Sequence, residues 1–135
     1  MSRKVDQKLY ANYLTKAEQS LRIAEMALNT KAFDAAVGNA IHSAINALDS
    51  LTVFSLGKRA ATDHSNVLSL LKPILGKDYS DIEKQFGALI ELKNSVEYQP
   101  YFVSEKDAHL SISRARRILE KVKTKLPKND RTIKE

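Results

Sequence analysis

The sequence has no cysteine, no tryptophan and only four glycines in 135 residues. The absence of cysteine excludes disulfide bonds and thiol catalysis, and it fits the reducing conditions of a cytoplasmic protein. No apolar run approaches the roughly 20 residues that a membrane-spanning helix needs, and the segment MSRKVDQKLY has no apolar core. We therefore expect neither a membrane span nor a signal peptide. The scarcity of glycine and the lack of runs of β-branched residues favour helices.

What the sequence contains in quantity is apolar and charged residues, at 43% and 28%. This is the composition of a globular domain, and the length corresponds to a single domain with one hydrophobic core. The net charge of +6 is local, since nine basic and three acidic residues lie from Arg114 onward. Such an excess is either an electrostatic footprint for nucleic acid or a solvated helix face with a frayed tail.

Hydrophobic periodicity predicts an all-α fold, an antiparallel up-and-down helical bundle of about five helices. The helices are predicted over residues 6–29, 34–57, 63–75, 80 to before Pro100, and 104–126. We expect Asp34 to cap the second helix, and the spacing of Ser80 and Glu83 predicts a capping box on the fourth. Residues 1–126 are expected to form a single helical domain, and residues 127–135 a flexible basic tail.

The second predicted helix carries unusually little charge. From Ala35 to Leu56 it has no lysine, arginine or glutamate, and Asp49 is its only charged residue. One half of its helical wheel is polar, and its short side chains are Asn39, His42, Ser43, Asn46, Asp49 and Ser50. This half either meets another helix, a second subunit or a ligand, or it packs with its polar groups satisfied internally. His42, Asn46 and Asp49 could form half of a metal site, but the missing third ligand leads us to expect no metal.

The stretch KNSVEYQP, residues 93 to 100, places a lysine among apolar neighbours. Ile82, Phe86, Leu89 and Val96 form one stripe at helical spacing, and Lys93 falls in the middle of it. An ammonium group at such a position must extend to solvent, pair with a carboxylate or open into a cleft. Pairing with Glu97 is one option, although the order of lysine before glutamate is the weaker one.

Three stretches together resemble the HEPN family. They are DAAVGNAIHSAINALDSLTVFSLG, LIELKNSVEYQPY and SEKDAHLSISRARRIL, which occur in this order between about Lys8 and Leu126. The resemblance implies an antiparallel helical bundle that usually dimerises. It also implies one of two activities. Active members are metal-independent ribonucleases, often toxins paired with a small nucleotidyltransferase antitoxin, and others are non-catalytic modules that bind RNA or nucleotides.

The catalytic motif of the family is an arginine, commonly followed by asparagine, with a histidine five positions after the arginine. Carried over to this sequence, Lys93 stands in place of the arginine, Asn94 matches, and Tyr98 stands in place of the histidine. A tyrosine hydroxyl is almost fully protonated at neutral pH, so it is a poor proton-transfer group. A lysine keeps the positive charge of the arginine but lacks the flat fork that grips a phosphate at two points.

We therefore expect a non-catalytic HEPN-type module that binds RNA, a nucleotide or a partner protein as a homodimer, without a cofactor. The expected binding residues are Lys93, Asn94, Tyr98, His42, Asn46 and Asp49. One alternative is a metal-independent ribonuclease, with Lys93 and Tyr98 as its catalytic residues, acting as the toxin beside a small nucleotidyltransferase partner. A second alternative is a purely structural module whose dimer surface is its whole function.

Overall fold

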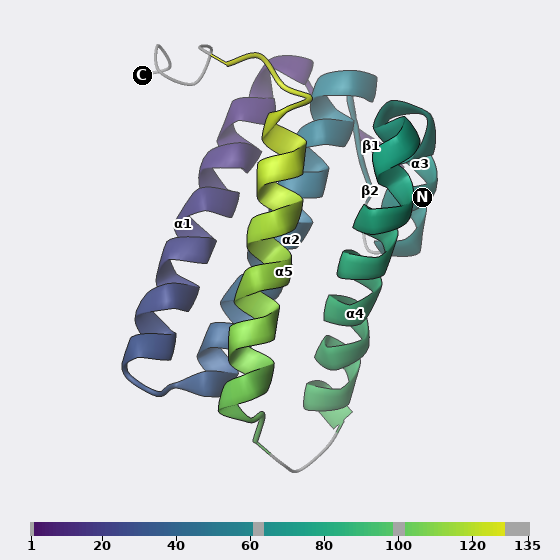
Figure 1. Ribbon diagram of the computed structural model, residues 1–135. Coiled ribbons are helices and arrows are strands. Elements are labelled where there is room, and N and C mark those ends of the chain that lie inside the picture. Colours follow the sequence, from purple (N-terminus) through teal and green to yellow (C-terminus); the bar gives the residue numbers. More distant parts are fainter. Residues whose placement is uncertain (1, 61–63, 99–101, 129–135) are drawn as a thin grey trace.

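The computed structural model describes residues 2–60, 64–98 and 102–128 of the chain (Figure 1). The elements in chain order are β1 (Ser2–Lys4), the 3-10 helix η1 (Gln7–Leu9), α1 (Tyr10–Asn29), α2 (Phe33–Leu56), β2 (Lys58–Ala60), α3 (His64–Leu75), the 3-10 helix η2 (Gly76–Asp78), α4 (Tyr79–Tyr98) and α5 (Glu105–Lys123). Helices make up most of the described fold, which confirms the prediction that the fold is all-α. Across the described ranges, no helix is both long and apolar enough to cross a membrane.

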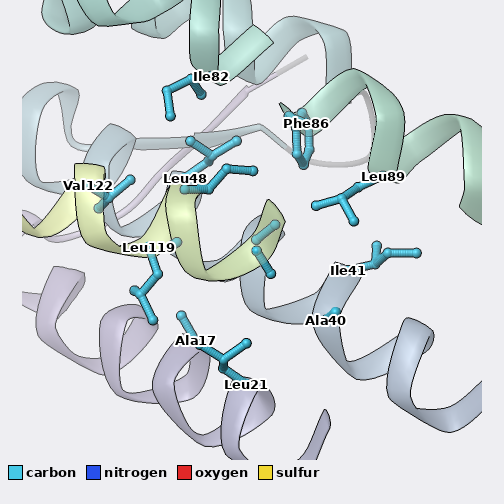
Figure 2. Close-up of a cluster of buried hydrophobic side chains, with 14 of the residues drawn as sticks. Ala17, Leu21, Ala40, Ile41, Leu48, Ile82, Phe86, Leu89, Leu119 and Val122 are labelled. Atoms are coloured by element: carbon cyan, nitrogen blue, oxygen red, sulfur yellow. The ribbon is translucent and has the colours of Figure 1, made fainter. Parts of the chain in front are cut away.

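The central element is α2. In Figure 1 it runs behind α5, between α1 on one side and α4 on the other. Figure 2 shows part of the core where these helices meet; its labelled side chains are Ala17, Leu21, Ala40, Ile41, Leu48, Ile82, Phe86, Leu89, Leu119 and Val122. Fully buried alanines, among them Ala17 and Ala40, let neighbouring helix backbones approach closely. A helix buried on so many sides has little surface for long charged side chains, which explains the composition of α2.

Two of the predicted helix caps are wrong, although these two helices begin within one residue of the predicted starts. Asp34 does not cap α2, because the helix begins one residue earlier with Ala32 at the N-cap position. Its carboxylate instead accepts a hydrogen bond from the backbone N–H of Val103, at 2.9 Å. The predicted capping box on α4 is also wrong, because η2 runs directly into α4 at Tyr79 and Ser80 already lies inside the helix. A helix that continues from a 3-10 turn has no separate cap for a sequence pattern to reveal.

The chain also forms a small β-ribbon that the sequence pattern did not predict. Strands β1 and β2 pair antiparallel, with Arg3 opposite Arg59. The ribbon follows the C-terminal end of α2, where Gly57 adopts a left-handed φ of 64°. The carbonyl of Gly57 accepts a hydrogen bond from the backbone N–H of Val5 at 2.9 Å. Three-residue strands rich in charged residues show no alternation of apolar and polar positions, so periodicity could not reveal them.

Candidate functional site

A cavity of about 150 Å³ lies between α2 and α4. Its lining residues are Asp34, Val37, Gly38, Ile41, His42 and Ile45 of α2, and Lys93 and Val96 of α4. Most of these side chains are apolar, and two of them, Lys93 and His42, carry nitrogen atoms that can donate to an anion. The cavity therefore combines apolar walls with a few polar groups, the side chains of Lys93 and His42 and the carboxylate of Asp34, which is typical of ligand sites.

Lys93 reaches this cavity because of its place on α4. Phe86 and Leu89 on the same face are buried in the core, and the helix turns Lys93 toward the same side one turn later. The lysine side chain is half-buried and lies on the cavity wall. Lys93 therefore lines a cleft, and the residue also makes an interaction within the chain. The side chain of Glu97, the expected pairing partner, lies outside the described residues.

His42 reaches the same cavity from α2. Its side chain is exposed, whereas Ser43, its neighbour in sequence, is fully buried. Sequence reasoning grouped His42 with Asn46 and Asp49 as one polar stripe. The structure separates them, since only His42 lines the cavity with Lys93.

The other polar side chains of α2 bond within the chain. Ser43 Oγ donates to the carbonyl of Ala17 on α1 at 2.7 Å, and Ser50 Oγ donates to Ala47 at 2.6 Å. The amide of Asn46 donates to the carbonyl of His42 at 3.0 Å. Among the described residues, no buried side-chain nitrogen or oxygen lacks a hydrogen-bond partner. Most of the polar half of α2 is therefore structural.

Asp49 forms an ion pair that sequence reasoning missed. Its Oδ2 lies 2.8 Å from Nε of Arg59, which comes from β2. Burial raises the pKa of Asp49, and the hydrogen bond and charge of Arg59 lower it only in part. The guanidinium of Arg59 also lies over the ring of Tyr13, 5.2 Å from its centre. This cluster fixes β2 against α1 and α2, and Asp49 is not among the cavity-lining residues.

The two other predicted binding residues of α4, Asn94 and Tyr98, give no further support to the cavity as a site. Asn94 follows Lys93 on α4 with an exposed side chain and does not line the cavity. Tyr98 is the last residue of α4, and its side chain lies outside the described residues. Within the described ranges, no three histidine, cysteine, aspartate or glutamate side chains come together in a group that could hold a metal ion.

The basic residues near the C-terminus face acidic partners on other helices. The ion pairs are Arg116 with Glu25, Lys123 with Glu18 at 3.3 Å, Arg117 with Asp81 at 2.8 Å, Lys121 with Asp78 at 3.4 Å, and Lys125 with Asp78 at 3.1 Å. A hydrogen bond from Lys125 holds the pKa of Asp78 below its ordinary value. Charges engaged in this way are less available to a polyanion, which favours the solvated-face interpretation of the basic excess over a nucleic-acid footprint.

Comparison with known protein families gives one match. A family model described as HEPN domain matches residues 10–125, which is most of the chain. No curated protein shows a significant match. The matched range contains every cavity-lining residue and the whole of α1 to α4.

Proposed function

The chain belongs to the HEPN family, and from this premise we propose that it is a non-catalytic HEPN module that binds the phosphate of a nucleotide or of RNA. The observation that carries the proposal is the meeting of Lys93 and His42, from different helices, in one apolar-walled cavity. Charge–charge attraction is stronger and less screened at a partly buried site than at an exposed one. An ammonium group placed there attracts anions more effectively than the solvated cations of α5.

The size of the cavity favours a phosphate group over a larger ligand. At about 150 Å³ it is well below the volume of pockets that enclose whole small molecules, roughly 300–1,000 Å³. Lysine binds phosphate as a point charge and does not need a flat bidentate geometry. The side chain of His42 adds a second donor from the facing helix.

The non-catalytic part of the proposal rests on the motif. Lys93 and Tyr98 occupy the positions of the arginine and the histidine of active members. Cleavage through a 2′-hydroxyl needs a side chain that exchanges a proton near neutral pH, and a tyrosine hydroxyl does so poorly. Binding and cleavage are thus separable here, because the positive charge is kept and the proton-transfer group is replaced.

A second candidate is supported by His42. An imidazole is the usual proton-transfer group of enzymes, and His42 lines the same cavity as Lys93. A metal-independent ribonuclease that uses His42 in place of the motif histidine is therefore the alternative function. In that case the small nucleotidyltransferase that accompanies many active members would be the expected partner.

We further propose the assembly that is usual in the family, a homodimer of antiparallel up-and-down bundles of about five helices. The end of α4 is the favoured contact, since the polar half of α2 is largely engaged within the chain. Asn94 and Tyr98 stay in the proposed binding site because they follow Lys93 in the family motif.

Titration with AMP tests the proposal. Lys93→Ala should weaken AMP binding at least about tenfold, because a charge-assisted contact is lost, and His42→Ala should weaken it less. Lys84→Ala is the matched control, since Lys84 is exposed on the same helix and does not line the cavity. Thermal unfolding of each variant separates a binding effect from a change in stability. If Lys93→Ala binds AMP as the wild type does, the cavity is not a phosphate site.

The same purified wild type and variants decide between the binding module and the ribonuclease. Incubated with RNA and a chelator, the wild-type protein should leave the RNA intact. Robust cleavage that disappears in His42→Ala would replace the binding module with the ribonuclease.

A further inference from the structure

A second, larger groove adjoins the phosphate cavity. It has a volume of about 420 Å³, and its lining residues are Lys31, Ala32, Phe33, Asp34, Ala35, Phe102 and Val103. Asp34 lines both the groove and the cavity, so the two are neighbours on the surface. The phosphate cavity alone is too small for a whole nucleotide, and the groove provides the missing space next to it.

The groove is built around an aromatic side chain that is unusually exposed. Phe102 is 88% exposed, far more than any other large apolar residue in the described part of the chain. Phe33, at the start of α2, is half-buried and packs against the core on the same groove. The hydrogen bond from Val103 N–H to the Asp34 carboxylate fastens the chain next to Phe102 to the first turn of α2. This bond holds the backbone next to Phe102 beside the start of α2, on the groove that Phe33 also lines.

The order of chemical groups along the two hollows matches the order of groups in a nucleotide. Aromatic side chains lie at one end, the carboxylate of Asp34 lies at the junction, and Lys93 and His42 lie at the other end. Flat aromatic rings stack on nucleic-acid bases, and a carboxylate can accept hydrogen bonds from ribose hydroxyls. One oxygen of Asp34 already accepts from Val103, but an ionised carboxylate has about four acceptor positions and keeps some for a ligand.

We infer that this groove holds the base of the nucleotide whose phosphate occupies the cavity, with its ribose at Asp34. The inference rests on the proposed function, because it needs the phosphate at Lys93 to fix the ligand in register. Base stacking on Phe102 is tolerant of base identity, so the site takes a nucleotide unit of any sequence. The unit is either a free nucleotide or one residue of single-stranded RNA.

The test compares a ligand that has a base with one that lacks it. The wild-type protein should bind AMP at least about fivefold more tightly than ribose 5-phosphate, since one stacked base contributes about that much or more. Phe102→Ala should remove this difference and leave the affinity for ribose 5-phosphate unchanged. Phe102→Tyr keeps the ring and should keep the difference. Leu110→Ala is the control for loss of an exposed apolar side chain, because Leu110 is exposed on α5 and lies outside the groove.

The outcomes separate this inference from the proposed function. If AMP and ribose 5-phosphate bind equally well to the wild type, and both binding constants fall in Lys93→Ala, the base site is wrong and the phosphate site stands. If neither compound binds to the wild type, the phosphate site itself is wrong. If Phe102→Ala changes the molar mass in light scattering without changing AMP affinity, Phe102 contacts a second copy and the base site is overturned.

A short oligoadenylate identifies the source of the nucleotide. Loss of affinity for the oligonucleotide in Phe102→Ala, by the same factor as for AMP, supports the inference with single-stranded RNA as ligand. Loss of affinity for AMP alone supports it with a free nucleotide as ligand. Because Phe102 is almost fully exposed, its substitution should leave the melting temperature unchanged, and the variants can be compared directly.

Discussion

Asp49 and Lys93 are two charged side chains in apolar surroundings, and the chain accommodates them differently. Asp49 is only 3% exposed and has Arg59 as its partner at 2.8 Å. Lys93 is half-buried on a cavity wall. A fully buried carboxylate needs a fixed partner, because removing its water is costly. A half-buried ammonium can instead exchange part of its hydration for a ligand. The first arrangement belongs to the fold and the second to the proposed site.

We predict that the free energy of unfolding of Asp49→Asn increases relative to that of the wild type as the pH rises. Burial raises the pKa of Asp49 above its ordinary value of 3.8, so the folded protein holds the proton more tightly than the unfolded chain. The contribution of this carboxyl to stability is therefore greatest below 3.8 and is lost as the pH rises through the raised pKa. Asparagine does not ionise, and the difference between the two proteins isolates the titration of Asp49.

Denaturant unfolding at about pH 4 and about pH 7 measures this difference. Arg59 is charged at both pH values, but it attracts Asp49 as an ion only where Asp49 is ionised, so the change of the difference with pH reports the balance between burial and this ion pair. A free-energy difference between wild type and variant that does not change with pH would show that Arg59 offsets the effect of burial on Asp49 completely.

At the scale of elements, α5 begins with a closed capping box. The Ser104 hydroxyl accepts from Asp107 N–H at 3.0 Å, and the Asp107 carboxylate accepts from Ser104 N–H, which closes a capping box. The box stands directly after Phe102 and Val103, where the chain is fastened to α2 through Asp34. The start of α5 therefore helps to hold the groove that we assign to the base.

We predict that Ser104→Ala lowers the free energy of unfolding by about 1 kcal/mol, the usual cost of removing an N-cap side chain. Ser113→Ala is the matched control, because Ser113 lies exposed in the interior of the same helix. Denaturant unfolding of both variants measures the difference. Equal stability of the two variants would mean that the capping box contributes nothing to the fold.

The sequence places the starts of α4 and α5 within one residue, but it assigns a capping box to Ser80 and misses the box at Ser104. Ser80 cannot act as a cap because α4 continues from η2 without a break, whereas Ser104 is preceded by non-helical backbone. The position of Lys93 in an apolar stripe indicates an inward-facing lysine, since periodicity reports which face a residue shares. Phe102 escapes such reasoning, because a single aromatic residue between two helices has no period and its exposure depends on tertiary packing.

At the scale of the whole molecule, the charge distribution is more balanced than the net charge of +6 suggests. Arg117, Lys121 and Lys125 reach acidic residues of η2 and α4, and Arg116 and Lys123 reach α1. Exposed pairs of this kind contribute little stability individually. Their larger effect is to reduce the positive potential along α5.

We predict a homodimer in solution. Dimerisation is usual in the HEPN family, and Ile23 and Met26 of α1 are exposed large apolar side chains available for a subunit contact. Light scattering at tens of micromolar should give twice the 15.1 kDa mass of one chain. Phe102→Ala should leave that mass unchanged if Phe102 serves a base and not a subunit contact. The mass of a single chain at every concentration would contradict the dimer.

The β-ribbon has a consequence for the order in which the chain is completed on the ribosome. Gln7 donates to the carbonyl of Phe54, 47 residues later in the sequence, and β1 pairs with a strand that follows still later. At about 5–20 residues per second, strand β1 waits roughly 3–11 s for its partner to be synthesised. An unpaired strand is prone to join other chains, and the two positive charges of Arg3 and Lys4 oppose this during the wait. The charged residues that give this strand no alternating apolar pattern thus also protect the nascent chain from misassembly.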